Sequence, residues 1–137
     1  MTTDPSDIRS VAVSAQDLLA ALEADARGES TAVLRVTPPF SGRMRARLHV
    51  VQNDAADETV HIPPAALVDD EAPPYPTPDE TADDLRAAAD ESYSVERHRT
   101  YHEQQVDQWR SRLLDHAVPS VTIPGTDHEV GVSLLGP

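Results

Sequence analysis

The chain has 137 residues, a length that fits one domain. It contains no lysine: all 11 basic residues are arginine, set against 24 aspartates and glutamates, for a net charge of -13. It also has no cysteine, which excludes disulfides, thiolate metal sites and a cysteine nucleophile. No apolar run reaches the ~18 residues of a membrane span, and residues 1–7 lack the basic and apolar parts of a leader. We therefore expect a soluble, cytoplasmic protein that does not contact the membrane.

The composition is typical of a protein adapted to concentrated salt. Alanine and valine supply 32 residues, whereas there is one phenylalanine and one tryptophan, so the core is built from small side chains. At 1 M salt the screening length falls to ~3 Å, which removes the self-repulsion of an acidic surface. Salts that are excluded from the surface also strengthen apolar burial. The alternative is an ordinary acidic protein without lysine, which would fold fully in dilute buffer.

The N-terminal part of the chain predicts a strand followed by a capped helix. Residues 1–7 are polar and are expected to form a disordered tail, and Ile8–Val13 alternates as a strand does. Ser14 is placed to cap a helix, since an acid follows three residues later. Leucines at helical spacing extend this helix to Arg27, and Gly28 ends it.

Two strands that follow predict a β-hairpin. Thr31–Thr37 and Arg43–Val51 both alternate, and the turn between them at 38–42 holds two prolines and a glycine. If the residues that flank this turn pair, Arg35 lies opposite Arg45 on the same face of the hairpin.

The second half of the chain predicts a strand, a linker, two helices and a second hairpin. In chain order they are a short strand at 59–62, an exposed linker rich in acids and proline at 69–76, helices at 77–89 and 94–118, and a hairpin at 121–134. An acidic loop at 53–58 precedes them. Residues 53–91 hold 12 of the 24 acids and one arginine, so the middle of the chain is strongly acidic.

Together these elements predict a single α+β domain over residues 1–137. Its sheet would be mainly antiparallel, made of the two hairpins plus one or two further strands. The helices Ser14–Arg27 and Ser94–Val118 would pack on its apolar face. Trp109 lies on the apolar stripe of the second helix and is the expected core anchor.

The candidate binding residues lie on the first hairpin. Arg43, Arg45 and Arg47 share one side of a strand, and Arg35 lies beside them on the partner strand. Like charges across a ladder destabilise it, so this face needs an anionic counterpart. That counterpart could be a partner protein, nucleic acid or another phosphorylated ligand, or the chain's own carboxylates. Phe40, expected at the hairpin tip, could stack on a base or insert into a partner.

No motif in the sequence predicts catalysis. His98 and His102 are four residues apart on a predicted helix, a spacing that would suit a metal, but both fall on the apolar stripe. We therefore expect core histidines, no metal and no other cofactor. A phosphate-binding glycine loop and a nucleophile elbow are both absent, and the acid pairs follow from the acidic composition. We expect no enzymatic activity and no catalytic residue; a metal- or carboxylate-dependent hydrolase is the alternative.

Two blocks of the sequence resemble a known family. VLRVTPPFSGRMRARLHVV at 33–51 and PPYPTPDET at 73–81 are similar to short, uncharacterised haloarchaeal proteins classed as a domain of unknown function. The resemblance extends from about Ile8 to the C-terminal hairpin. It implies an archaeal halophile as the source, and it implies no activity, cofactor or catalytic residue.

The sequence thus predicts a salt-adapted, non-enzymatic protein-interaction module with an unknown protein partner. Its expected contact surface is Arg35, Arg43, Arg45, Arg47 and Phe40. The alternative is binding of nucleic acid or another phosphorylated ligand by the same arginine-rich hairpin.

Overall fold

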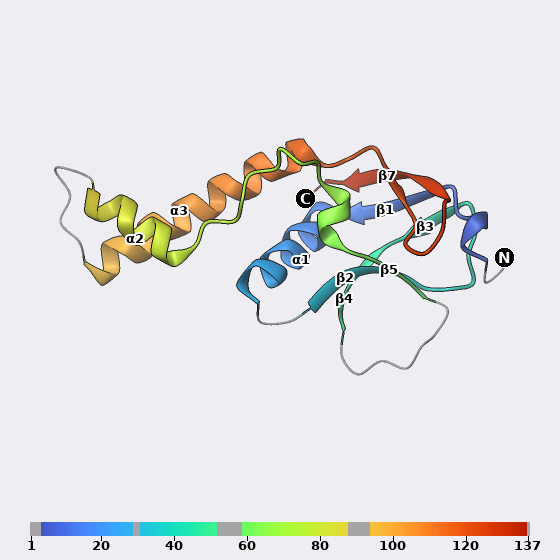
Figure 1. Ribbon diagram of the computed structural model, residues 1–137, viewed down its shortest axis with the longest axis horizontal. Coiled ribbons are helices and arrows are strands. Elements are labelled where there is room, and N and C mark those ends of the chain that lie inside the picture. Colours follow the sequence, from blue (N-terminus) through green and yellow to red (C-terminus); the bar gives the residue numbers. More distant parts are fainter. Residues whose placement is uncertain (1–3, 29–30, 52–58, 88–93, 137) are drawn as a thin grey trace. The chain divides into compact units, whose positions relative to one another are not determined.

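The computed structural model describes residues 4–28, 31–51, 59–87 and 94–136. In these ranges the chain forms three α-helices and two β-sheets, so the predicted α+β class is confirmed (Figure 1). The chain divides into two compact units. We call Met1–Asp70 with Ala117–Pro137 the sheet unit and Glu71–His116 the helical unit. That both belong to one domain stays a prediction.

The first sheet of the sheet unit has four strands in the order β3-β1-β7-β6. Its central strands, β1 (Ser10–Ser14) and β7 (Glu129–Leu135), run parallel, and β3 (Arg43–Arg45) lies parallel to β1 on the other side. The fourth strand, β6 (Ser120–Thr122), pairs antiparallel with β7, which confirms the predicted second hairpin. Alternation puts the valines of β1 in the core, because successive side chains of a strand point to opposite faces.

The second sheet has three antiparallel strands in the order β4-β2-β5. They are β2 (Thr31–Val36), β4 (Arg47–Val51) and β5 (Val60–Ile62). Leu34, Val36 and Ile62 are fully buried on one face. That face joins one hydrophobic cluster with the valines of β1 and with residues of the first helix.

The predicted return strand Arg43–Val51 is in fact two strands that belong to different sheets. Ala46 separates them: its side chain is fully buried, and its N–H donates to the Ala12 carbonyl of β1 at 3.0 Å. Consequently Arg35 lies opposite Arg47, and the predicted pairing of Arg35 with Arg45 is wrong. The sequence conceals the break because the alternation of arginine with smaller residues continues through Ala46.

Helix α1 (Ala15–Arg27) follows β1 directly and packs on the second sheet. The predicted cap is confirmed, since the Ser14 side chain accepts the Asp17 N–H at 3.0 Å and Gly28 ends the helix with φ 68. The Asp17 carboxylate in turn accepts the Leu48 N–H at 3.2 Å. The first turn of α1 therefore holds the edge strand β4 in place.

The helical unit consists of α2 (Pro78–Ala87), α3 (Val95–Leu113) and a short 3-10 helix, Leu114–His116. That the second long helix packs on the sheet stays a prediction; within the helical unit, α3 contacts α2 and the 3-10 helix that follows it. Trp109 is buried, its indole N–H donates to the Pro73 carbonyl at 2.9 Å, and the Tyr75 ring meets it edge-on at 4.9 Å. Trp109 is thus a core anchor, and Pro73 and Tyr75 of the segment predicted as a linker contact it.

Smaller segments differ in detail from the expectation. Pro5–Asp7, predicted to be disordered, forms a 3-10 turn capped by Asp4. A second such turn, Pro64–Leu67, follows β5. The acidic loop predicted at 53–58 lies outside the described residues. None of the described helices combines the length and the apolarity that a bilayer-crossing segment needs.

We predict that Asp17→Ala lowers the free energy of unfolding by about 1 kcal/mol, because the Leu48 N–H loses a charged acceptor. Asp17→Asn, which keeps an acceptor, should lose less, and Gln16→Ala in the same turn is the matched control. Urea unfolding at fixed KCl measures all three. Equal stability of Asp17→Ala and Gln16→Ala would show that the contact does not hold β4.

Candidate anion-binding site

Basic side chains form a row across the second sheet, on the face opposite the core. The register places Arg35 of β2 between Arg47 of β4 and His61 of β5. Side chains directly opposite on antiparallel strands are about 5 Å apart at their Cβ atoms. His49, two residues along β4, lies on the same face, and its ring centroid is 5.5 Å from that of His61. We call Arg47, Arg35, His61 and His49 the cation row.

A cavity of about 340 Å³ opens beside this row. Three arginines reach it from both sheets: Arg35 from β2, Arg47 from β4, and Arg45 from β3. The Arg35 residue is half-buried, whereas Arg45 and Arg47 are exposed. The cavity, which we call the arginine pocket, is lined by Arg35, Thr37, Met44, Arg45, Arg47 and Leu48. None of the described residues of this lining is a carboxylate.

Arg43, the fourth predicted site residue, lies at a different cavity. That cavity has a volume of about 450 Å³ and is lined by Asp7, Arg9, Ser10, Gly42 and Arg43. The Gly42 carbonyl accepts both the Arg9 and the Ser10 N–H at 2.9 Å, which ties the start of β1 to the start of β3. Sequence reasoning missed Arg9, because no local pattern reveals the parallel pairing that brings these strands together. The predicted arginine face is therefore divided, with three of its members together and one apart.

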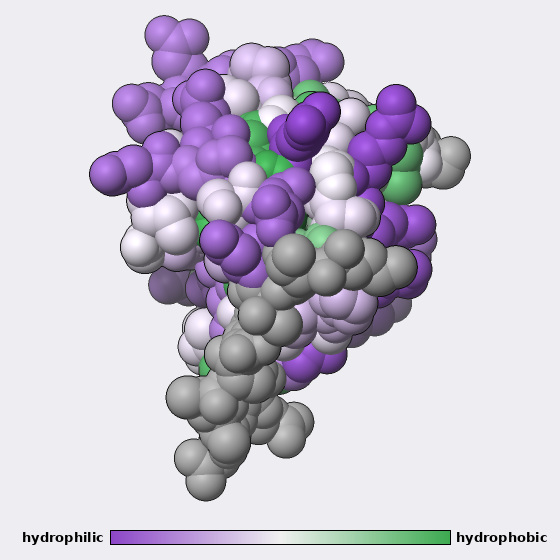
Figure 2. Space-filling model, turned by 90° about the vertical axis from the view of Figure 1, so that its right-hand side faces the viewer, coloured by the Kyte–Doolittle hydropathy of each residue, from purple (hydrophilic) through white to green (hydrophobic). Residues whose placement is uncertain are grey.

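The arginine pocket has no described anionic partner. Across residues 4–28, 31–51, 59–87 and 94–136, no carboxylate forms an ion pair with Arg35, Arg45 or Arg47. Like charges that face each other across a ladder repel, so the Arg35–Arg47 pair raises the energy of the empty site. An anion that bound there would remove this repulsion. In the view of Figure 2, most of the coloured surface is hydrophilic, and hydrophobic residues show only between polar ones.

Phe40 is part of the core and does not lie exposed at a tip as predicted. Its side chain is fully buried and packs in the same cluster as the inward residues of β1 and β2. The reason is that the segment after β2 leads from the second sheet to β3 of the first, and its apolar ring is buried in the cluster that both sheets share. Phe40 is therefore unavailable for stacking on a base.

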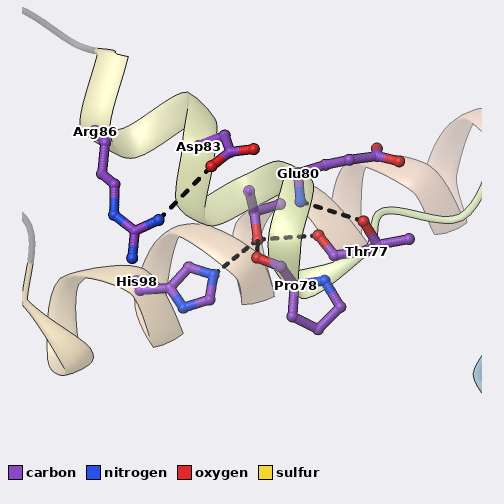
Figure 3. A network of polar contacts seen from close by, with 7 residues as sticks. Thr77, Pro78, Glu80, Asp83, Arg86 and His98 are labelled. Atoms are coloured by element: carbon purple, nitrogen blue, oxygen red, sulfur yellow. Dashed lines mark hydrogen bonds and ion pairs between the residues drawn. The ribbon is translucent and has the colours of Figure 1, made fainter.

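The histidines of α3 form a separate polar cluster in the helical unit. The buried Thr81 hydroxyl lies 2.9 Å from His98 Nε2 and contacts the Thr77 and Pro78 carbonyls at 3.3 and 3.1 Å (Figure 3). It also lies 2.9 Å from His102 Nδ1. Carbonyl oxygens can only accept, so the Thr81 hydroxyl donates its single proton to them. Its oxygen therefore accepts hydrogen bonds from both imidazoles. The two histidines are therefore hydrogen-bonded to Thr81, but both are half-buried, so the prediction that they belong to the core is not confirmed. No group of three or more potential metal ligands occurs among the described residues.

A third cavity, of about 580 Å³, lies in the helical unit and carries both signs of charge. Its lining includes Asp84, Glu96, Arg97 and Tyr101. The Tyr101 hydroxyl donates to the Asp84 carboxylate at 3.5 Å, and burial together with that negative charge raises the pKa of Tyr101. Because the lining has two acids and one base, this cavity has no excess of positive charge that would attract an anion.

Comparison with protein families supplies one match. The family model described as a domain of unknown function, DUF8009, matches residues 1–136. The chain belongs to the DUF8009 family. No curated protein and no solved structure shows significant similarity to it. Membership of a family of unknown function agrees with the resemblance in the sequence, whereas the archaeal source stays a prediction.

In this DUF8009 protein, we predict that Arg47→Gln raises the free energy of unfolding by about 0.5 kcal/mol in the lowest KCl that permits folding, since it removes a like-charge contact with Arg35. The gain should vanish at about 1 M KCl, where charges are screened. Arg99→Gln, on the exposed surface of α3, is the matched control. A loss of more than about 1 kcal/mol would instead identify a carboxylate of the chain as the partner of Arg47.

We also predict that Phe40→Ala costs about 3–5 kcal/mol of stability, because it leaves a cavity in the core. Phe40→Leu should cost less and remain folded, so that its ligand binding can be compared with that of the parent protein. Leu48→Ala, at an exposed position, is the control. A Phe40→Ala variant of full stability would contradict the buried placement.

Proposed function

We propose that this DUF8009 protein is a non-enzymatic binding module whose arginine pocket holds a compact anionic group such as a phosphate or sulfate ester. The observation that supports this is the convergence of Arg35, Arg45 and Arg47 on one cavity, with no carboxylate among the described residues that line it. Guanidinium groups bind such oxyanions through paired, charge-assisted hydrogen bonds. A volume of about 340 Å³ lies near the lower end of the range for ligand pockets, so a small charged group fits better than a large one.

The net charge favours a small ligand over nucleic acid. A polynucleotide would have to approach a chain of net charge -13 along an extended path, whereas a compact anion meets only the pocket. Contacts to a phosphate backbone also weaken steeply as salt rises, because binding releases counterions. The absence of lysine and the acidic surface favour a salt-filled cytoplasm as the setting. Bidentate contacts in a concave site are the kind that persist there.

A protein partner is the second candidate, and the edge strand β4 favours it. Leu48 and Val50 are 38% and 42% exposed, and Leu48 also lines the arginine pocket. A partner segment that covers these apolar side chains could place an acidic residue over the arginines. This is the protein-interaction module that the sequence predicted, with a carboxylate in place of the phosphate. Weak response to free anions, combined with an intact fold, would favour this candidate.

We predict that sulfate and inorganic phosphate bind saturably when amide NMR signals are followed at constant ionic strength. Arg45→Ala/Arg47→Ala should weaken binding about 100-fold, since each removes a charge-assisted hydrogen bond worth roughly 1.5–3 kcal/mol. The affinity of Arg45→Lys/Arg47→Lys should lie between those of the parent protein and the alanine variant, because lysine keeps the charge but lacks the planar guanidinium group.

The matched control is Arg99→Ala/Arg112→Ala, which removes the same charge from exposed positions of α3. It should bind as the parent protein does. Equal weakening in the control would show that binding only reflects net charge. An absence of any saturable response, with the spectrum of a folded protein, would overturn the proposed site.

A further inference from the structure

We infer that His61 and His49 belong to the same anion site, and that their protonation makes it bind a compact dianion more tightly as the pH falls. This inference rests on the proposed function of the arginine pocket. It adds two residues to that site, and it adds a regulating variable, the proton.

The first step is placement. Arg35 has His61 as its register partner on one side and Arg47 on the other, so the three side chains stand in one line across the sheet. His49 is joined to the line by its ring contact with His61 and by its position two residues from Arg47. Both imidazoles are thus next to the arginines that line the pocket. Histidine is the side chain whose ordinary titration falls between pH 5 and 8.

The second step concerns hydrogen bonding. The Nε2 atom of His61 lies 3.1 Å from the Thr59 hydroxyl. A hydroxyl can accept a hydrogen bond from a protonated ring nitrogen and can donate one to an unprotonated nitrogen. The contact therefore survives in both charge states of His61. A proton can be gained or lost here without rearrangement of the strand.

The third step is electrostatic. The described charged or titratable groups that share this face with His61 are Arg35 on β2, and Arg47 and His49 on β4. All of them are cationic when charged. Helix α1 and the turn after β5 supply apolar side chains to the core on the other face of the sheet, among them Leu18 and Leu67. An added proton on His61 is therefore repelled by the cationic side chains beside it.

A bound dianion changes the sign of that environment. It attracts each additional positive charge on the row, so it favours the protonated form of His61 and His49. By linkage, protonation must then favour the anion by the same factor. Binding is strongest at the acidic end of the histidine range and declines as the pH rises through it. Near neutral pH, binding should draw protons from the solvent.

The experiment uses sulfate, whose charge does not change in this range, so that only the protein titrates. For the parent protein we expect binding about tenfold tighter near pH 5.5 than near pH 7.5, a coupling of ordinary size. Calorimetry near pH 6.5 in two buffers of different ionisation enthalpy should show net proton uptake on binding. His49→Gln/His61→Gln should bind sulfate with one affinity at both pH values and should take up no protons.

His128→Gln is the control, since it removes a histidine of the sheet unit that lies outside the cation row and contacts the Ile8 carbonyl. It should keep the pH dependence of the parent protein. This inference would be overturned if the parent protein bound sulfate equally at both pH values, or if the control lost its pH dependence as the double variant does. Neither result would contradict anion binding by the arginine pocket. A complete absence of sulfate binding at either pH would overturn the proposed function itself.

Discussion

The central constraint in this molecule is the repulsion between two guanidinium groups that face each other across a β-ladder. Arg35 and Arg47 are paired in register on strands of the same sheet, and no described carboxylate stands between them. Such an arrangement costs energy in the empty protein. The charge is unusual here because acids outnumber arginines by 24 to 11 in the chain as a whole. An anion that bound at this place would therefore relieve a charge repulsion that is already present in the folded protein.

The change of sheet at Ala46 brings the arginines around one cavity. Because Ala46 is buried and bonded to β1, the chain passes there from one sheet to the other. Arg45 is left on the first sheet and Arg47 on the second, and the arginine pocket opens beside them. A continuous hairpin would have spread the arginines along one ribbon. The change of sheet gathers three of them around a concavity, where water is partly excluded and bidentate contacts are strongest.

The two units of the chain use their polar side chains differently. In the helical unit the histidines serve the fold, since His98 and His102 share the buried Thr81 hydroxyl and Trp109 anchors the segment that enters α2. In the sheet unit, His49 and His61 lie beside arginines on the sheet face opposite the core. The same residue type contacts a buried threonine hydroxyl in one place and stands in a row with arginines in the other. Surroundings, and not spacing along the chain, make the difference.

Local chemistry allowed much of the fold to be predicted from the sequence alone. The cap at Ser14, the stop at Gly28, the β6–β7 hairpin and the core role of Trp109 all depend on neighbours a few residues apart or on one apolar stripe. The tertiary structure alone decided that Arg43–Val51 divides at Ala46, that Phe40 is buried, and that Arg9 joins Arg43. It also decided that His61 stands beside Arg35. Those facts depend on pairing between distant strands, and period-two alternation is the same whichever strand lies alongside.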